Sequence, residues 1–276
     1  MSIIQAVVLS ALQGFTELFP FSSLGIQVVA PHLLHWSIDE SSPQFLPFIV
    51  SLHVGTALAL VIYFLRDWIQ LVDAWARSID TGFRDLRRDA QQKTVWLIIA
   101  ATVPAGLVGL ALHHPLSRLF AAPLMASLLL IVNGLIMAWG DRRLRHGHED
   151  IPSMSYRQAA GIGVAQVLAL IPGFSRSGVT IVGGLTLGLS YETAARFSFL
   201  MATPIILAAG VLELGKLHGG HGFLLPAVVG GVVSGVVAYL SVRYLMRYFR
   251  TGGLSPMAVI SVLAGAAFSG LLLLGR

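Results

Sequence analysis

The chain has 276 residues, of which 55% are hydrophobic and 11% are charged. A soluble globular domain carries about 25% charged residues, so this composition excludes an ordinary soluble enzyme and indicates an integral membrane protein. The net charge is +5, but the cations lie in short loops between apolar runs, which is typical of cytoplasmic loops rather than of a nucleic-acid-binding surface. The absence of cysteine excludes disulfides, thiolate nucleophiles and Cys-ligated metals.

The first apolar stretch, about 2–34, is interrupted near its middle by Pro, Gly and Ser residues. Gln13 and Glu17 are four residues apart in it and therefore share one face of a predicted helix, which Pro20 ends. A carboxylate at membrane depth costs about 2.5–3.5 kcal/mol and marks a functional site by default, whereas the alternative is a Glu17 near the interface that extends outward. The turn after the proline adds three candidate residues: Ser22, Ser23 and Gly25.

Six further stretches are long enough to cross a membrane as helices, at about 28–35 Å each. They are 46–65, 95–113, 122–140, 193–213, 223–245 and 255–274. His53 lies inside the first of them, either as a hydrogen-bonded core residue or as part of a site. The charged segment 66–93 contains six cations and five Asp, which nearly cancel, and is predicted to form a solvated amphipathic surface helix.

A second interrupted stretch, about 157–189, carries Arg176 between two serines and two glycines. Glycines allow the backbone to turn its N–H groups toward a ligand, and Arg binds phosphate oxygens two at a time. The alternative is that Arg176 only pairs with Glu17 or with a carbonyl group to join the two halves. The neighbouring candidate residues are Gly173, Ser175, Ser177 and Gly178.

The distribution of cations predicts the topology. If both interrupted stretches are re-entrant, 15 of the 18 Lys and Arg residues fall on one side of the membrane, which puts 66–93 in the cytoplasm and both termini outside. The interrupted stretches correspond at an offset of 153 residues and, because each half has three spans, the second half is an inverted copy of the first. We predict a single all-α membrane domain, 1–276, with about six transmembrane helices, two re-entrant broken-helix segments, and halves of about 1–145 and 146–276.

Together the interrupted stretches offer a carboxylate, an amide, four hydroxyls and a guanidinium in apolar surroundings, which suits a phosphate or pyrophosphate head group on a lipid tail. Glu17 can hold a divalent cation or accept a proton from the attacking group, and Arg176 can neutralise phosphate charge. No carboxylate lies at ligand spacing from the loop histidines, which are interpreted as solvated residues.

These motifs resemble those of one known family, the undecaprenyl-pyrophosphate phosphatases, also called bacitracin-resistance proteins. The resemblance rests on the segments 13–23 (QGFTELFPFSS), 52–56 (LHVGT), 172–178 (PGFSRSG) and 197–200 (FSFL), and it extends over nearly the whole chain. It implies an integral membrane hydrolase with an inverted-repeat fold, which removes one phosphate from undecaprenyl pyrophosphate on the outer face of the bacterial plasma membrane. That reaction regenerates the lipid carrier for peptidoglycan synthesis.

The resemblance also implies residue roles. Glu17 and Gln13 match the two acids of the first family motif, Ser23 matches a proposed nucleophile, and Arg176 matches the phosphate-binding arginine. The residues assigned to substrate binding are Ser22, Gly25, His53, Gly173, Ser175, Ser177 and Gly178. The family implies a divalent cation, Mg²⁺ or Ca²⁺, which we assign to Glu17. The expected partners are the prenyl pyrophosphate lipid and the membrane, with a homodimer as a further possibility and no nucleic acid.

Four positions depart from the family pattern. Gln13 stands where many members carry Glu, Leu24 and Ile26 where Thr and His are usual, and Arg196 where Glu is usual. These differences leave open a slower enzyme, a phosphatase for another prenyl pyrophosphate, or a protein that is not catalytic. The alternative function is a transporter or flippase of a phosphorylated prenyl lipid, which inverted repeats also serve. Hydrolysis is favoured because the acidic and the basic parts of a phosphoryl-transfer site are both retained.

Overall fold

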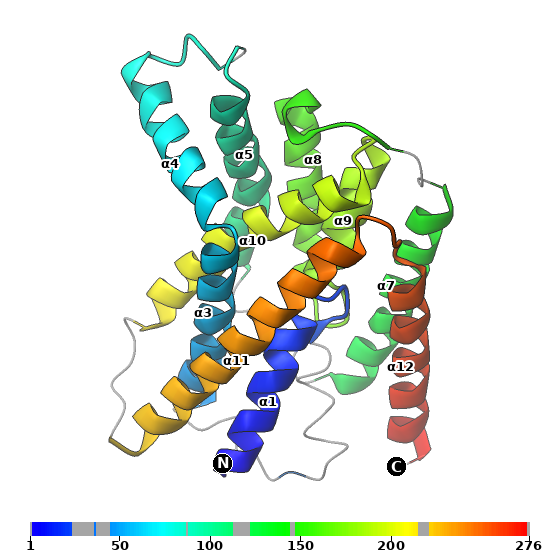
Figure 1. Cartoon of the computed structure of the whole chain (residues 1–276). Helices are drawn as coiled ribbons and strands as arrows, with labels where there is room; N and C mark the ends of the chain where they lie inside the picture. The colour runs from blue at the N-terminus through cyan, green and yellow to red at the C-terminus, as the bar shows by residue number, and fades with distance from the viewer. Residues whose placement is uncertain are drawn as a thin grey trace.

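The computed structural model describes residues 2–23, 36, 45–86, 88–112, 122–143, 147–214 and 221–274. Over these residues the chain is almost entirely helical (Figure 1). The helices are α1 (Ile3–Thr16), α3 (Phe45–Tyr63), α4 (Leu65–Asp80), α5 (Ala90–Ala111), α7 (Pro123–Arg143), α8 (Tyr156–Val167), α9 (Arg176–Thr186), α10 (Tyr191–Leu214), α11 (His221–Tyr248) and α12 (Ser255–Leu274), with single turns η2 (Ile151–Ser153) and η3 (Leu168–Leu170). The two ends of the chain lie at the same end of the molecule, opposite the connection between α4 and α5.

Among the described helices, α5, α7, α10, α11 and α12 each contain a segment that is long and apolar enough to cross a membrane. α3 is followed by α4 after a break at Phe64, and the two helices pass the same test as a pair that is bent by 83°. If that pair is counted as one span, the described part of the chain contains six spans, the number that the sequence predicts, although the sequence confines this span to 46–65 and assigns 66–93 to the surface. The protein is therefore an all-α integral membrane protein.

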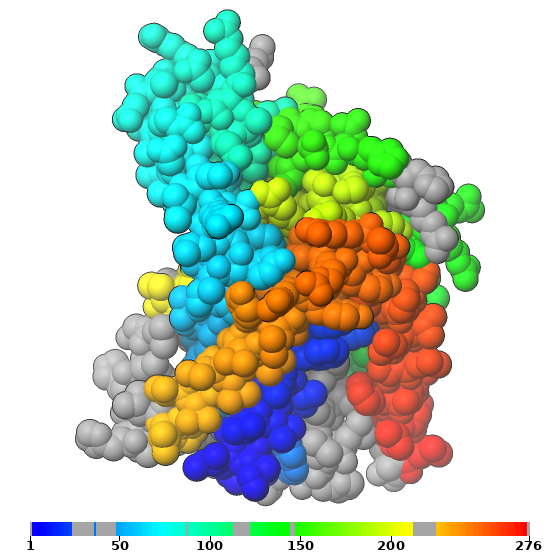
Figure 2. All heavy atoms as spheres, in the orientation of Figure 1, coloured from blue at the N-terminus to red at the C-terminus, as the bar shows by residue number. Residues whose placement is uncertain are grey.

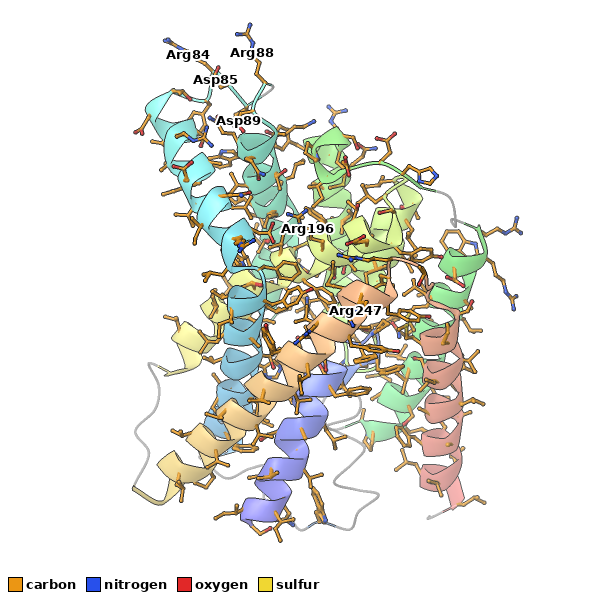
Figure 3. All side chains as sticks on the ribbon, in the orientation of Figure 1. Arg84, Asp85, Arg88, Asp89, Arg196 and Arg247 are labelled. Carbon is orange, nitrogen blue, oxygen red and sulfur yellow. The ribbon has the colours of Figure 1, made fainter. Side chains whose placement is uncertain are left out.

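α4 is the amphipathic helix that the sequence predicts within 66–93. Most of its large apolar side chains are exposed, whereas ion pairs hold it near both ends. Asp67 pairs with Arg196 of α10, and the Nη1 atom of Arg77 lies 2.7 Å from the Oδ2 atom of Asp89, which caps the start of α5. Figure 3 shows Arg196 and Asp89 at these two places.

The helix packing repeats between the two halves of the chain. α1 packs against α11 as α8 packs against α5, and α3 packs against α11 as α10 packs against α5. In addition, α3 packs against α10, and α7 packs against α12. An exchange of α1 with α8, α3 with α10, α5 with α11 and α7 with α12 leaves this pattern unchanged, as an inverted repeat requires. The division into halves near residue 145 stays a prediction.

α11 lies across α1 and α3 at very short range (Figure 2). A Cβ atom on Gly55 of α3 would lie 2.0 Å from the carbonyl oxygen of Gly231, and a Cβ atom on Gly14 of α1 would lie 2.3 Å from that of Ser234. Small residues let helix backbones approach this closely, which is how helices pack in a membrane. The contact holds the C-terminal end of α1 in place, where the candidate site begins.

Candidate active site

Two reversals of the chain meet in the middle of the molecule. α1 enters from the end that carries the N-terminus, α8 enters from the opposite end, and both helices stop about halfway (Figure 1). The Ser22 hydroxyl accepts a hydrogen bond from the Gly173 N–H at 2.9 Å, and the Ser177 hydroxyl donates to the Phe19 carbonyl at 3.3 Å. The two interrupted stretches that the sequence singles out are therefore in direct contact.

The second reversal depends on a glycine and a helix cap. Gly173 has a φ of +108°, which L side chains rarely adopt, and a Cβ atom there would lie 2.5 Å from the carbonyl oxygen of Ala126. α9 begins three residues later and is capped by Ser175, whose hydroxyl accepts a hydrogen bond from the Gly178 N–H at 3.1 Å. This cap sets Arg176 at the first position of α9.

Asn133 of α7 ties the two reversals together. Its Nδ2 atom donates to the Pro20 carbonyl at 3.2 Å, and its Oδ1 atom accepts from the Ser175 N–H at 3.0 Å. The side chain is fully buried, so both bonds form away from water. The sequence analysis missed this residue, and the one signal for it is a lone amide within the apolar stretch 122–140.

Glu17 is the centre of the polar contacts at this meeting point. Its Oε1 atom lies 3.0 Å from the Nη2 atom of Arg176, and its Oε2 atom accepts hydrogen bonds from Gln13 Nε2 at 3.0 Å and from Ser23 Oγ at 2.8 Å. The Nε2 atom of His53 lies 3.7 Å from the same oxygen, while the Nδ1 atom of this ring is 2.9 Å from the Ile49 carbonyl.

Three of the four residues predicted to act in catalysis thus contact the carboxylate of the fourth, Glu17, and His53 lies beside it. Only 8% of the Glu17 side chain and 13% of the Arg176 side chain are exposed. The alternative in which Glu17 extends outward at the interface is therefore wrong. Arg176 does pair with Glu17 and joins the two halves, but its Nη1 atom is buried and has no hydrogen-bond partner within the described part of the chain. That nitrogen remains available to a ligand.

Five of the residues predicted to bind substrate build the two loops instead. The Ser22 hydroxyl accepts from Gly173, and the Ser175 hydroxyl accepts from Gly178 and bonds to the Ser177 hydroxyl at 3.1 Å. The N–H groups of both glycines are thereby satisfied inside the protein, so they do not offer the backbone donors that the sequence suggests. The sixth loop residue, Gly25, lies outside the described residues, as do Leu24 and Ile26.

A cavity of about 330 Å³ opens beside these residues. Its polar lining comes from Glu17, Ser23, His53, Arg176 and Gln166, the last of which the sequence analysis did not assign to the site. The rest of the lining is mainly apolar: Phe21, Ile49, Val50, Ala105, Ala169, Leu170, Phe174, Ile205, Ile206, Ala209 and Gly210. A charged end and an apolar wall suit an amphiphile with an anionic head and a hydrocarbon tail.

The side chains that line the cavity could ligate a divalent cation only in part. No group of three or more His, Asp or Glu side chains at metal-binding distance occurs among the described residues, and Glu17 is the one carboxylate in the cavity lining. Mg²⁺ is commonly held by one or two carboxylates together with substrate phosphates, so Glu17 fits a cation that arrives with a pyrophosphate. A preformed cage of protein ligands is not present in the described part.

Arg196 does not alter the charge of the site. It pairs with Asp67 at the start of α4 and lines a different cavity, between α4, α5, η2 and α10. The charge of Arg196, which departs from the family pattern, is therefore balanced by the Asp67 carboxylate, and Arg196 is not part of the lining of the cavity that contains Glu17 and Arg176.

Comparison with known proteins finds relatives along nearly the whole chain. The family model described as bacitracin resistance protein BacA matches residues 6–267. A protein of Chromobacterium violaceum named undecaprenyl-diphosphatase 2 is 49% identical over 256 residues, which cover 91% of this chain and 90% of the relative. A protein of Burkholderia ambifaria with the same name is 46% identical over 272 residues (98% and 97%), and an undecaprenyl-diphosphatase of Acidiphilium cryptum is 47% identical over 271 residues (95% and 95%).

Proposed function

The chain belongs to the bacitracin resistance protein BacA family, and we propose that it hydrolyses undecaprenyl pyrophosphate to undecaprenyl phosphate and inorganic phosphate. This reaction recycles the lipid carrier for cell-wall synthesis. The observation that carries the proposal is the Glu17–Arg176 pair, which lies at the polar end of a cavity whose other walls are apolar. An anionic head group binds at the charged end, and the prenyl chain lies against the apolar wall.

Arg176 binds the pyrophosphate in this mechanism. Its Nη1 atom has no protein partner within the described residues and donates to a terminal phosphate oxygen, while its Nη2 atom stays on Glu17. A fixed guanidinium in low-dielectric surroundings stabilises the negative charge of the transferring phosphoryl group. When bound, a divalent cation, Mg²⁺ or Ca²⁺, adds further charge neutralisation there, with Glu17 as its protein ligand.

Ser23 is the nucleophile in this mechanism, and Glu17 is its general base. The Ser23 hydroxyl already donates to the Oε2 atom of Glu17 at 2.8 Å, the geometry for proton transfer to that carboxylate. The deprotonated oxygen attacks the terminal phosphorus, and the bond from that phosphorus to the bridging oxygen breaks, which releases undecaprenyl phosphate. Water then hydrolyses the phosphoserine, with Glu17 again as base. His53, whose Nε2 atom lies 3.7 Å from Glu17, takes up and returns the proton through one bridging water molecule.

Phosphate release by purified protein in detergent tests the proposal. Wild-type protein is expected to release phosphate from undecaprenyl pyrophosphate in a Mg²⁺- or Ca²⁺-dependent manner, and Glu17→Gln and Arg176→Lys are expected to abolish the release. The matched controls are Glu192→Gln and Arg250→Lys, which change an exposed ion pair of 3.1 Å away from the cavity and leave activity unchanged. If folded wild-type protein releases no phosphate from several prenyl pyrophosphates, the enzyme proposal is wrong and lipid transport becomes the function to test.

We also place the protein in the bacterial plasma membrane with both termini outside, from its 15-to-3 cation distribution. Because the chain contains no cysteine, single substitutions report sidedness without background. Ser2→Cys is expected to react with a membrane-impermeant maleimide in intact cells, and Thr81→Cys only after the membrane is opened. The reverse pattern would invert the topology.

A further inference from the structure

Gln166 is a buried amide in the wall of the cavity. It lies one residue before the end of α8, is 2% exposed, and lines the cavity that contains Glu17 and Arg176. Neither its Oε1 nor its Nε2 atom has a hydrogen-bond partner within the described part of the chain. Buried amides are nearly always hydrogen-bonded, and an amide that is left unpaired beside a cavity requires an explanation.

A comparison with Gln13 supplies that explanation. α1 and α8 both begin with a Ser–Gln capping box, and the boxes, like the two glutamines, are 153 residues apart. Gln13 donates to Glu17, four residues further along. The residue four positions after Gln166 is Leu170, which lines the same cavity and whose side chain can accept no hydrogen bond. Gln166 therefore holds the place of Gln13 in the second half without the carboxylate that satisfies it.

We propose that Gln166 is a binding residue for the anionic head of the substrate. Its Nε2 atom donates to a phosphate oxygen of the bound pyrophosphate, and its Oε1 atom accepts from water in the cavity. Arg176 Nη1 is the other buried donor of the cavity lining that has no partner among the described residues. A neutral amide adds a directional donor without further charge, so the guanidinium and the amide together hold the head group in one orientation. The inference rests on the proposed function, since it assigns a residue to the same site.

Kinetics of Gln166→Leu and Gln166→Met test this assignment. Both substitutions remove the two polar atoms of the amide, and Met also keeps the length of the Gln side chain. In both variants kcat/KM for undecaprenyl pyrophosphate is expected to fall about tenfold to a hundredfold, the size of one hydrogen bond to a charged group. The Ki of inorganic pyrophosphate as a competitor is expected to rise by a similar factor. The thermal midpoint of the unliganded protein is expected to stay unchanged or to rise, because an unpaired buried amide is removed.

The matched control is Gln92→Leu. Gln92 is also 2% exposed, and its Oε1 atom also has no partner among the described residues, but it belongs to α5 and lies outside this cavity. Its substitution is expected to leave kcat/KM and Ki at wild-type values. If Gln166→Met folds and keeps the wild-type kcat/KM and Ki, the assignment is overturned and Gln166 is only a core residue.

A second measurement separates this inference from the proposed function. Inorganic pyrophosphate is expected to raise the thermal midpoint of wild-type protein and to raise it less in Gln166→Met. If wild-type protein is stabilised in this way but releases no phosphate, hydrolysis fails while the binding role stands. If pyrophosphate gives no stabilisation of the wild type, and no inhibition, the role of Gln166 in binding is refuted.

Discussion

The Ser22 hydroxyl accepts a hydrogen bond from the Gly173 N–H at 2.9 Å, which joins residues 151 positions apart in the chain. In Ser22→Ala this buried N–H loses its acceptor, at a cost of about 1–3 kcal/mol. We expect a lower thermal midpoint and a loss of activity, because one of the direct contacts between the two loops is then removed. Ser10→Ala is the control: the buried Ser10 hydroxyl donates only to the Ala6 carbonyl of its own helix, so its loss leaves no such donor. Equal midpoints for both variants would refute the role of the contact.

Replacing Asn133 is expected to damage the site more than the helix that carries it. Asn133→Leu removes the acceptor for the Ser175 N–H and the donor to the Pro20 carbonyl, both of which stay buried. The loss is expected to reach about 2–3 kcal/mol of folding free energy, with a fall in kcat as the loops lose their register. Denaturant titration in detergent and steady-state kinetics measure the two effects. Wild-type kcat in a folded Asn133→Leu protein would contradict this role.

A glycine at the close contact of α3 with α11 is expected to respond to substitution differently from a glycine with open space around it. Gly55→Ala would place its Cβ 2.0 Å from the Gly231 carbonyl oxygen, so the helices must separate and the protein is expected to be destabilised. Gly270→Ala lies in α12 with nothing within 4 Å of the new Cβ, and is expected to be neutral or to stabilise by up to about 1 kcal/mol. Thermal midpoints in the same detergent decide between them. A stable Gly55→Ala protein would show that this contact is loose.

Acid is expected to weaken the junction between α4 and α5. Burial opposes ionisation of Asp89, but the N–H groups of Gln92 and Gln91 and the Arg77 guanidinium outweigh it, so its pKa is lowered from 3.8. A carboxyl whose folded pKa lies below its unfolded pKa stabilises the fold above the unfolded value, and this contribution is lost as the pH falls through the folded value.

The comparison of Asp89→Asn with wild type measures this effect. The variant is expected to be less stable at pH 6, and the difference in thermal midpoint is expected to shrink as the pH falls below about 4. A difference between Asp89→Asn and wild type that is constant with pH would indicate that the charge of Asp89 does not contribute to stability.

The sequence predicts the membrane helices well, because the length of an apolar run directly reflects the thickness of the bilayer core. It also identifies Glu17 and Arg176, since a charge in an apolar stretch is costly unless it has a function or a partner. Their pairing across 159 residues follows from the repeat only in outline, and the 3.0 Å contact emerges in the folded chain alone.

Other parts of the site have no sequence signature. Asn133 is a single amide in an apolar run, and no spacing connects it to the loops that it contacts. The repeat relates Gln166 to Gln13, but it does not indicate that Gln166 lines the cavity. The hydroxyls of Ser22, Ser175 and Ser177 could be counted in the sequence, but whether they face a ligand or one another depends on the turn of the backbone at Gly173. Residue type thus indicates the chemistry of this site, and only the fold assigns each group to binding or to support.

The Glu17–Arg176 ion pair joins two halves of the chain that could be expressed as separate fragments. Glu17 follows α1 and Arg176 begins α9. A break of the chain between α7 and α8 would therefore give one fragment with Glu17 and another with Arg176. Neither fragment alone could assemble the cavity. Co-expression of both in one membrane should restore the pair, because the contacts of α1 and α3 with α11, of α8 with α5 and of α7 with α12 all cross the break.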